Sequence, residues 1–261
     1  MKGTTPPLAS VRAYWQANPV AASAVPFPLG SPEYFSYYDH LRELNEPKEF
    51  SARLHEYSAF ANRAVLDIGS GNGYVLSRYA AAGASTYGVD LTETAVDLCR
   101  RRFALMGLPG RFMVGNAETL PFDDKTFDCV CSMGVLHHTP DTAKAVSEVF
   151  RVLRPGGRVI LMFYHRNSLQ YRVKFPMRRW LKGKSIQQSI NEVDGIGNPK
   201  GDVYSKRELA ALLSRFRDLE LFAGVLPWHA VGPARGLVPG PLRTFLERRL
   251  GWFLYAKGVR P

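Results

Sequence analysis

Short apolar segments alternate with helical patterns between residues 47 and 165, and this alternation constrains the fold more than any other feature of the sequence. Five segments have the composition of buried strands, at residues 64–68, 86–90, 111–115, 127–132 and 158–164. Residues 139–154 predict a helix. Thr139 is its expected cap, Pro140 suits its first turn, and the negative charge of Asp141 interacts favourably with the helix dipole. The repeated order of strand, helix and strand predicts an α/β fold with a doubly wound, mostly parallel sheet, whose ligands bind beyond the carboxyl ends of the strands.

Two less regular regions flank this core. Residues 1–46 are rich in proline and aromatic residues and predict an N-terminal cap or lid, which leaves residues 47–261 as the main domain. Within that domain we expect a basic insertion at 166–203 and a second insertion at 226–251. Between and after them, the patterns predict a helix at 206–216, a strand at 219–225, a helix at 241–250 and a strand at the edge of the sheet at 252–257.

The composition excludes several classes of protein. The chain has 261 residues, 46% of them hydrophobic but dispersed, so no run approaches the roughly 18 to 20 apolar residues of a membrane span. The N-terminus lacks the apolar block of a secretory signal, and the three cysteines are an odd number, so we expect a reducing, cytoplasmic setting. Cys129 and Cys131 lie two apart in a predicted strand, where core packing explains them better than a metal pair does, and we expect no metal site.

A glycine turn follows the first predicted strand. Asp67 precedes glycines at 69, 71 and 73, where tight backbone geometry lets amide groups approach a ligand closely. The dinucleotide fingerprint needs a third glycine five residues after the first, but Tyr74 or Leu76 stands there, depending on the register. The turn is therefore not a nicotinamide site. Asp90 ends the second predicted strand, in a position to accept both hydroxyls of a ribose.

Five motifs follow one another in order, each at the end of a predicted strand: residues 65–73, 88–91, 115–122, 134–138 and 153–157. Over roughly residues 64–165 the chain resembles the class I S-adenosylmethionine-dependent methyltransferases, in the small-molecule branch similar to the ubiquinone and menaquinone biosynthesis methyltransferases. The resemblance implies a Rossmann-like, seven-stranded sheet with an antiparallel edge strand. It also implies S-adenosylmethionine as the methyl donor and S-adenosylhomocysteine as the product.

Carried over residue by residue, the resemblance implies a set of cofactor contacts. Asp90 takes the ribose hydroxyls, Leu91 lies against the adenine, and Asn116 and the Ala117 backbone read its edge. Asn116 stands where the family often has Asp, but an amide oxygen still accepts a hydrogen bond. The methionine portion is held by the remaining residues of the set: Asp67, Gly69, Ser70, Gly71, Gly73, Ser132 and Met133.

Methyl transfer from a sulfonium is an in-line displacement and requires no metal. Besides the cofactor site, the enzyme therefore needs residues that position the substrate and a base that removes its proton. His137, after the fourth predicted strand, is the candidate base, although two adjacent histidines there are also typical of capping. The candidate substrate contacts, each of which ordinary packing also explains, are Tyr14, Trp15, Tyr34, Tyr38, His138, Tyr164 and His165.

The net charge of +11 is concentrated after the fifth predicted strand, where residues 166–184 hold seven basic residues and no acid. Leu169, Val173, Met177, Trp180 and Leu181 recur there at helical spacing. This pattern predicts either a contact with an anionic membrane, which would make the protein membrane-peripheral, or a solvated cover of the pocket. No nucleic-acid module accompanies the charge, so nucleic acid is not favoured as a partner.

Together these features predict an S-adenosylmethionine-dependent methyltransferase that acts on an oxygen or carbon nucleophile of a small aromatic or lipophilic molecule. Two alternatives stay open: methylation of RNA or protein, and a module that binds S-adenosylmethionine without turnover. The sequence specifies neither the substrate nor the oligomeric state.

Overall fold

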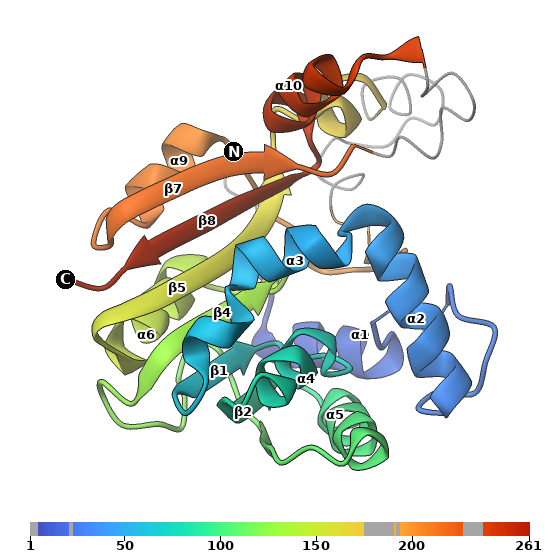
Figure 1. Cartoon of the computed structure of the whole chain (residues 1–261), viewed down its shortest axis with the longest axis vertical. Coiled ribbons are helices and arrows are strands. Elements are labelled where there is room, and N and C mark those ends of the chain that lie inside the picture. The colour runs from blue at the N-terminus through green and yellow to red at the C-terminus, as the bar shows by residue number, and fades with distance from the viewer. Residues whose placement is uncertain (1–4, 21–22, 175–190, 192–193, 227–236) are drawn as a thin grey trace.

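The structure is a computed structural model that describes residues 5–20, 23–174, 191, 194–226 and 237–261. The described residues form one eight-stranded sheet, which confirms the predicted α/β class (Figure 1). The order is β3-β2-β1-β4-β5-β8-β7, with β6 beside β5. The strands are β1 (Ala64–Ile68), β2 (Ser85–Asp90), β3 (Arg111–Val114), β4 (Phe127–Met133), β5 (Leu153–His165), β6 (Val203–Tyr204), β7 (Arg217–Gly224) and β8 (Phe253–Val259).

The last strand is not where the sequence pattern placed it. Strands β1 to β5 pair in parallel, whereas β8 is antiparallel to both of its neighbours, β5 and β7. The prediction that residues 252–257 form the edge strand is therefore wrong, because β7 occupies that edge. The burial agrees with this order, since five consecutive residues of β8 are buried while β7 is largely exposed along its first half. The two-residue strand β6 was not predicted.

The helices begin and end at local signals. Asp141, not Thr139 as predicted, caps α6, because its side chain accepts a hydrogen bond from the Lys144 amide at 3.0 Å. Thr139 instead donates to the Leu136 carbonyl at 2.7 Å. The α-helices are α1 (Leu8–Ala17), α2 (Pro32–Asn45), α3 (Lys48–His55), α4 (Tyr74–Ala81), α5 (Glu93–Met106), α6 (Thr142–Val152), α9 (Lys206–Leu212) and α10 (Gly240–Leu250). Shorter turns are η1 (Tyr57–Phe60), η2 (Leu136–His138) and η3 (Gln170–Lys174).

Alternate residues of the central strands pack into two cores, one on each face of the sheet. Val65, Cys129 and Cys131 belong to the core that α3, α4 and α5 cover, and both cysteines are buried and free, as packing predicted. Leu66 and Val130 belong to the other core, which α6 and α9 cover (Figure 1). Burial on both faces accounts for the short, nearly continuous apolar strands.

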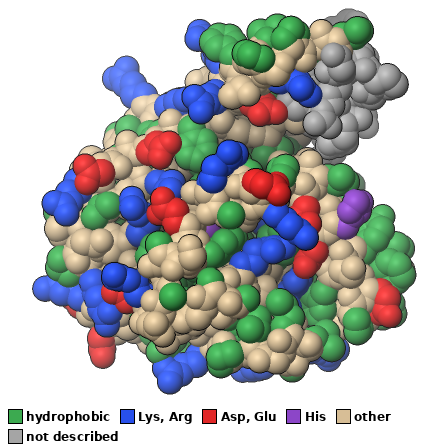
Figure 2. All heavy atoms as spheres, in the orientation of Figure 1, with side chains coloured by type: hydrophobic (Ala, Val, Ile, Leu, Met, Phe, Trp, Pro, Cys, Tyr) green, Lys and Arg blue, Asp and Glu red, His purple; other side chains and the backbone are tan. Residues whose placement is uncertain are grey.

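The regions outside the sheet are described in part. The cap predicted at 1–46 holds α1 and α2, both of which contact α5, and its boundary stays a prediction. Of the basic segment at 166–184, residues 175–184 lie outside the described residues, and the part before them holds the short turn η3. Much of the second insertion, at 227–236, also lies outside them. Figure 2 shows apolar side chains on the surface near α10, where Leu242 and Phe245 are exposed. No helix in the described ranges is both long and apolar enough to cross a membrane.

Candidate active site

The glycine turn joins β1 to α4 and is built on an unusual backbone. Gly69, Gly71 and Gly73 have φ values of 73°, 55° and 78°, in a region that residues with side chains rarely adopt. A side chain at Gly69 would in addition collide with Val135. The Gly69 amide donates to the Val89 carbonyl at 2.7 Å, which fixes the turn against β2. The turn thus needs glycine at all three positions for its conformation, and at Gly69 for space as well.

A cavity of about 1100 Å³ opens beside this turn, at the carboxyl ends of β1, β2, β4 and β5. The cap helices α1 and α2 contribute residues to its wall, so the cavity is enclosed from both the sheet and the cap. The predicted site residues that the wall brings together are Asp67, Gly69, Ser70, Gly71, Asp90, Leu91, Ala117, Met133, Trp15, Tyr38, His138 and Tyr164.

Three predicted cofactor residues lie outside this wall, each in a supporting role. Gly73 is the N-cap of α4. The Asn116 side-chain oxygen accepts from the Glu118 amide at 3.0 Å, and the Ser132 hydroxyl donates to the Ile68 carbonyl at 2.8 Å. These polar groups are engaged in shaping the loops and strand ends behind the cavity.

Three predicted substrate contacts are likewise outside the wall. The Tyr34 hydroxyl donates to the Val20 carbonyl at 2.8 Å and the ring is almost fully buried. The Tyr14 hydroxyl donates to the Asp194 carbonyl at 2.9 Å. His165 Nδ1 lies 3.0 Å from the carbonyl of Gly251. These side chains hold the cap and the insertions in place.

The two adjacent histidines of η2 have different surroundings. His137 is fully buried outside the cavity wall, and burial lowers its pKa well below the ordinary value, with His138 and Lys200 adding to the effect. His138 lines the cavity instead, with Nδ1 2.6 Å from the Lys200 carbonyl and Nε2 3.3 Å from Asp194 Oδ2. The structure therefore corrects the expectation that His137 faces the active-site edge, because the short turn directs its neighbour there.

Two carboxyl groups stand at the ends of adjacent strands. Asp67 is 3% exposed, and burial raises its pKa to about 7, against the opposing effects of Cys131 and Arg42. Asp90 accepts hydrogen bonds from the Gly71 amide at 3.1 Å and from the amide and hydroxyl of Thr92 at 3.1 and 3.0 Å. Burial raises the pKa of Asp90 as well, while these hydrogen bonds oppose the shift. The hydrogen bonds orient Asp90, and both acids border the same cavity.

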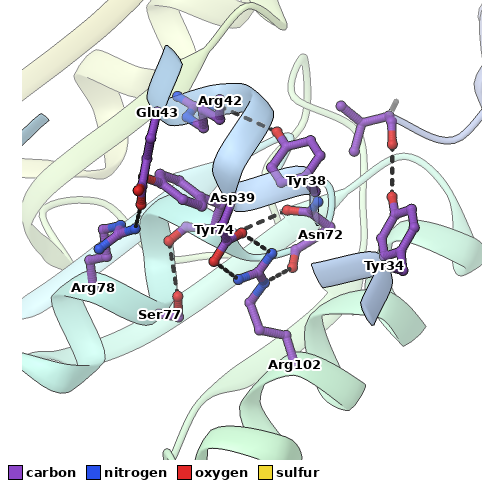
Figure 3. A network of polar contacts seen from close by, with 11 residues as sticks. Tyr34, Tyr38, Asp39, Arg42, Glu43, Asn72, Tyr74, Ser77, Arg78 and Arg102 are labelled. Atoms are coloured by element: carbon purple, nitrogen blue, oxygen red, sulfur yellow. Dashed lines mark hydrogen bonds and ion pairs between the residues drawn. The ribbon is translucent and has the colours of Figure 1, made fainter. Parts of the chain in front are cut away.

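A polar network attaches the cap to the glycine turn (Figure 3). Arg102 of α5 donates from Nε to the Asn72 carbonyl at 2.8 Å and from both terminal nitrogens to Asp39 of α2, at 3.0 and 2.8 Å. Nearby, Arg78 of α4 pairs with Glu43 of α2 at 2.6 Å. The cap, the turn and two helices of the main domain therefore share one set of charged contacts.

The wall holds two further charged residues that were not predicted from the sequence, Arg42 and Asp194. Arg42 pairs with Glu46 at 2.7 Å, and Tyr38, Arg42 and Glu46 recur at intervals of four residues, a spacing that places them on one face of α2. This interval of four residues is the signal in the sequence that could have identified Arg42. Asp194 lies in an irregular insertion, where no local pattern marks it.

Comparison with known proteins gives consistent results. A family model described as a methyltransferase domain matches residues 66–161. The chain is 33% identical over 172 residues to a ubiquinone/menaquinone biosynthesis C-methyltransferase of Marinomonas sp., covering 64% of this chain and 65% of that protein. It is 36% identical over 123 residues to a phthiotriol/phenolphthiotriol dimycocerosates methyltransferase of Mycobacterium tuberculosis, covering 45% of each. The match thus spans less than two thirds of each relative's own length.

The fold has counterparts among solved structures. An S-adenosylmethionine-dependent methyltransferase from Methanosarcina mazei superposes with a TM-score of 0.55 at 22% identity, covering 79% of this chain and 96% of that one. At this identity the likeness concerns the fold alone.

Proposed function

The chain belongs to the class I S-adenosylmethionine-dependent methyltransferases, and on that premise we propose that it transfers a methyl group to an oxygen or carbon nucleophile of a small aromatic or lipophilic molecule. One observation carries the proposal: Asp67 and Asp90 border a single cavity on either side of the glycine turn. The names of the two relatives, which refer to quinone biosynthesis and to dimycocerosates, support a lipophilic substrate.

The residues of the cavity fit S-adenosylmethionine by their chemistry. A volume of about 1100 Å³ is at or above the upper end of the usual range for small-molecule sites, so it has room for the cofactor and a second ligand. Asp90 has a carboxylate already oriented by Thr92 and Gly71, as a bidentate acceptor for a ribose diol requires. Leu91 and Ala117 form the neighbouring wall, where an adenine would lie.

Asp67 and the backbone of the glycine turn would hold the methionine portion. A buried carboxyl group with a pKa raised to about 7 becomes ionised when a cation binds beside it, and the cofactor carries an ammonium group. When bound, S-adenosylmethionine supplies an electrophilic methyl group on a sulfonium. The protein's own task is then to align a nucleophile with that methyl group and to exclude water.

The base that we propose is His138, in place of His137. His138 lines the cavity, whereas His137 is fully buried outside its wall and its pKa is lowered well below the ordinary value. Trp15 packs edge-on against the His138 ring, with centroids 5.2 Å apart, and closes the cavity from α1. Trp15, Tyr38 and Tyr164 are the predicted substrate contacts that remain candidates, since all three line the wall.

The test has two arms. Calorimetric titration with S-adenosylmethionine measures whether the site binds the cofactor, with Asp90→Ala as the variant expected to weaken it. Incubation with S-adenosylmethionine and a cell metabolite extract, followed by detection of S-adenosylhomocysteine and of a product heavier by one methylene, measures turnover. Binding without any S-adenosylhomocysteine would identify a binding module instead of an enzyme, and no binding would reject the proposal.

A further inference from the structure

We infer that one end of the molecule, formed by α10 and by residues 166–173 at the start of the insertion after β5, docks on the surface of an anionic lipid bilayer. The docking surface consists of the exposed apolar and basic side chains of these two stretches. The inference goes beyond the proposed function, because it concerns a partner and not the reaction. It starts from α10, whose outer face is exposed.

The two sides of α10 differ in composition. The helix contacts β7, and none of its residues is fully buried. Its half-buried residues lie three or four apart and so form one side of the helix: Arg243, Leu246, Glu247 and Leu250. Its exposed side chains are Pro241, Leu242, Thr244, Phe245, Arg248 and Arg249. Because the single acid of α10, Glu247, lies on the half-buried side, the exposed face is apolar and basic, as in helices that lie in a membrane interface.

The start of the insertion after β5 presents the same combination of side chains. Leu169 and Val173 are 46% and 53% exposed, and Arg172 beside them is exposed as well. Leu237, shortly before α10, is 84% exposed. Residues 166–174 and 237–250 together hold six basic residues and one acid, and Figure 2 shows Lys and Arg side chains beside apolar ones at this end. Apolar side chains of this kind insert among acyl chains, while the basic ones bind anionic headgroups.

An aromatic cluster joins the two stretches to each other and to the cavity. Tyr171 of η3 and Trp252, two residues after α10, both pack near Tyr164, with ring centroids 6.5 and 5.8 Å from it. Both stretches lie at the same end of the molecule (Figure 1). Tyr164 lines the cavity, as does Ile196, which is 85% exposed. A bilayer docked at this end would therefore lie close to one wall of the cavity, which suits the lipophilic substrate of the proposed function.

Charge distinguishes this surface from other exposed apolar side chains and favours a bilayer over a second copy of the chain. In the cap, Tyr37 is 36% exposed, but Glu33, one turn earlier on the same face of α2, is exposed too and would repel anionic headgroups. A symmetric dimer through α10 would place Arg248 and Arg249 near the same residues of the other copy, where like charges repel. An anionic bilayer instead supplies both the negative charge and the apolar layer.

Flotation with lipid vesicles measures the docking. Vesicles of phosphatidylglycerol and phosphatidylcholine should bind the protein, whereas phosphatidylcholine alone should not, and binding should weaken as salt rises from about 25 to about 500 mM. Arg248→Gln combined with Arg249→Gln should lower the partition coefficient about 10-fold or more at low salt. The matched control, Arg100→Gln combined with Arg217→Gln, removes the same charge from side chains that are more than half exposed, and should lower it less than about threefold.

A fluorescent label tests which face of the molecule docks. The three native cysteines are buried, so a thiol-reactive dye whose emission depends on polarity labels only an introduced cysteine. On Phe245→Cys, the emission should shift to the blue when anionic vesicles are added. On Leu105→Cys, the control, it should not shift, although Leu105 of α5 is exposed to the same degree as Phe245, 56% against 55%.

Several results would overturn the inference. These are no binding of the parent protein at low salt, equal binding to phosphatidylcholine alone, equal losses for the two charge variants, and a shift for Leu105→Cys without one for Phe245→Cys. A dimer in solution that dissociates in the variant Leu242→Ser with Phe245→Ser would also overturn it, since this face would then join two copies. Melting temperatures show whether each variant is folded. Vesicle binding by a protein that does not bind S-adenosylmethionine would support the docking and reject the proposed function.

Discussion

Removing the carboxylate of Asp39 tests whether the cap stabilises the glycine turn. Asp39 of α2 accepts two hydrogen bonds from Arg102, at 3.0 and 2.8 Å, while Arg102 also donates to the carbonyl of Asn72 (Figure 3). The Arg102 side chain is 4% exposed and that of Asp39 is 29% exposed. The substitution Asp39→Ala therefore leaves a buried guanidinium without its counter-ion.

The expected loss of stability follows from the burial of this ion pair. Breaking a fully buried ion pair by removing one partner costs about 3 to 5 kcal/mol, and water reaching the Asp39 side reduces this to about 2 to 3 kcal/mol. For a chain of this size that corresponds to a fall in Tm of roughly 4 to 12 °C. Because Arg102 also holds the Asn72 carbonyl next to Gly71 and Gly73, we expect S-adenosylmethionine affinity to fall about 5- to 10-fold as well.

Thermal unfolding of the free protein and calorimetric titration with S-adenosylmethionine measure the two effects. Asp97→Ala is the control, since Asp97 pairs with Arg100 on the surface of α5 with both side chains more than half exposed, and such pairs contribute little. A Tm and an affinity for Asp39→Ala that match those of the control would refute the reasoning. A lowered Tm with unchanged affinity would confine the network to a structural role.

Three further predictions concern the acids of the cavity and the exposed helix α10. Asp90→Ala should weaken S-adenosylmethionine binding by about 1.5 to 3 kcal/mol, because two ribose hydroxyls lose a charged acceptor, and an unchanged Kd would contradict that role. The pKa of Asp67 is raised from 3.8 to about 7 in the folded protein, so its contribution to the free energy of unfolding is fully present below about pH 4 and is lost as the pH rises to about 7. Asp67→Asn should therefore flatten the dependence of Tm on pH and raise Tm above pH 7, and parallel curves for variant and parent would exclude the shift. If the protein docks on an anionic membrane, replacing the exposed Leu242 and Phe245 by Ser should abolish its sedimentation with anionic vesicles at low salt, and a parent protein that does not sediment would reject the docking.

The class of fold could be predicted because it depends on local periodicity. Strands buried on both faces, such as β1 and β4, are apolar over nearly their whole length, and a glycine turn between a strand and a helix has few alternatives. The position of β8 could not be predicted in this way, since its neighbours β5 and β7 are chosen by long-range pairing. The cap of α6 was misplaced by two residues for a local reason, because the Thr139 hydroxyl donates to the Leu136 carbonyl of η2.

In the candidate site, too, some residues could be predicted from the local sequence and others could not. That Asp67, Gly69, Gly71 and Asp90 lie together beside the cavity could be predicted, because each stands at or just after a strand end and the sheet brings these ends together. Which of the two histidines of η2 faces the cavity depends on the path of a single short turn, and adjacent positions in the sequence do not reveal it. Asp194 could not be found from the sequence because tyrosines from α1 and β5, far away in the chain, hold it in place.

The position of β8 inside the sheet also bears on how the protein folds. Among the described strands, β8 comes last in the chain; it pairs with β5, and β7 joins the sheet through β8 alone. Until β8 is synthesised and docked, β5 and β7 each present an open row of amide and carbonyl groups, the kind of edge on which chains aggregate. Pairing over such a separation is slow compared with the closing of local contacts. We expect this part of the sheet to close late, so a nascent chain that has already formed its glycine turn and first core would still depend on β8 to protect those edges.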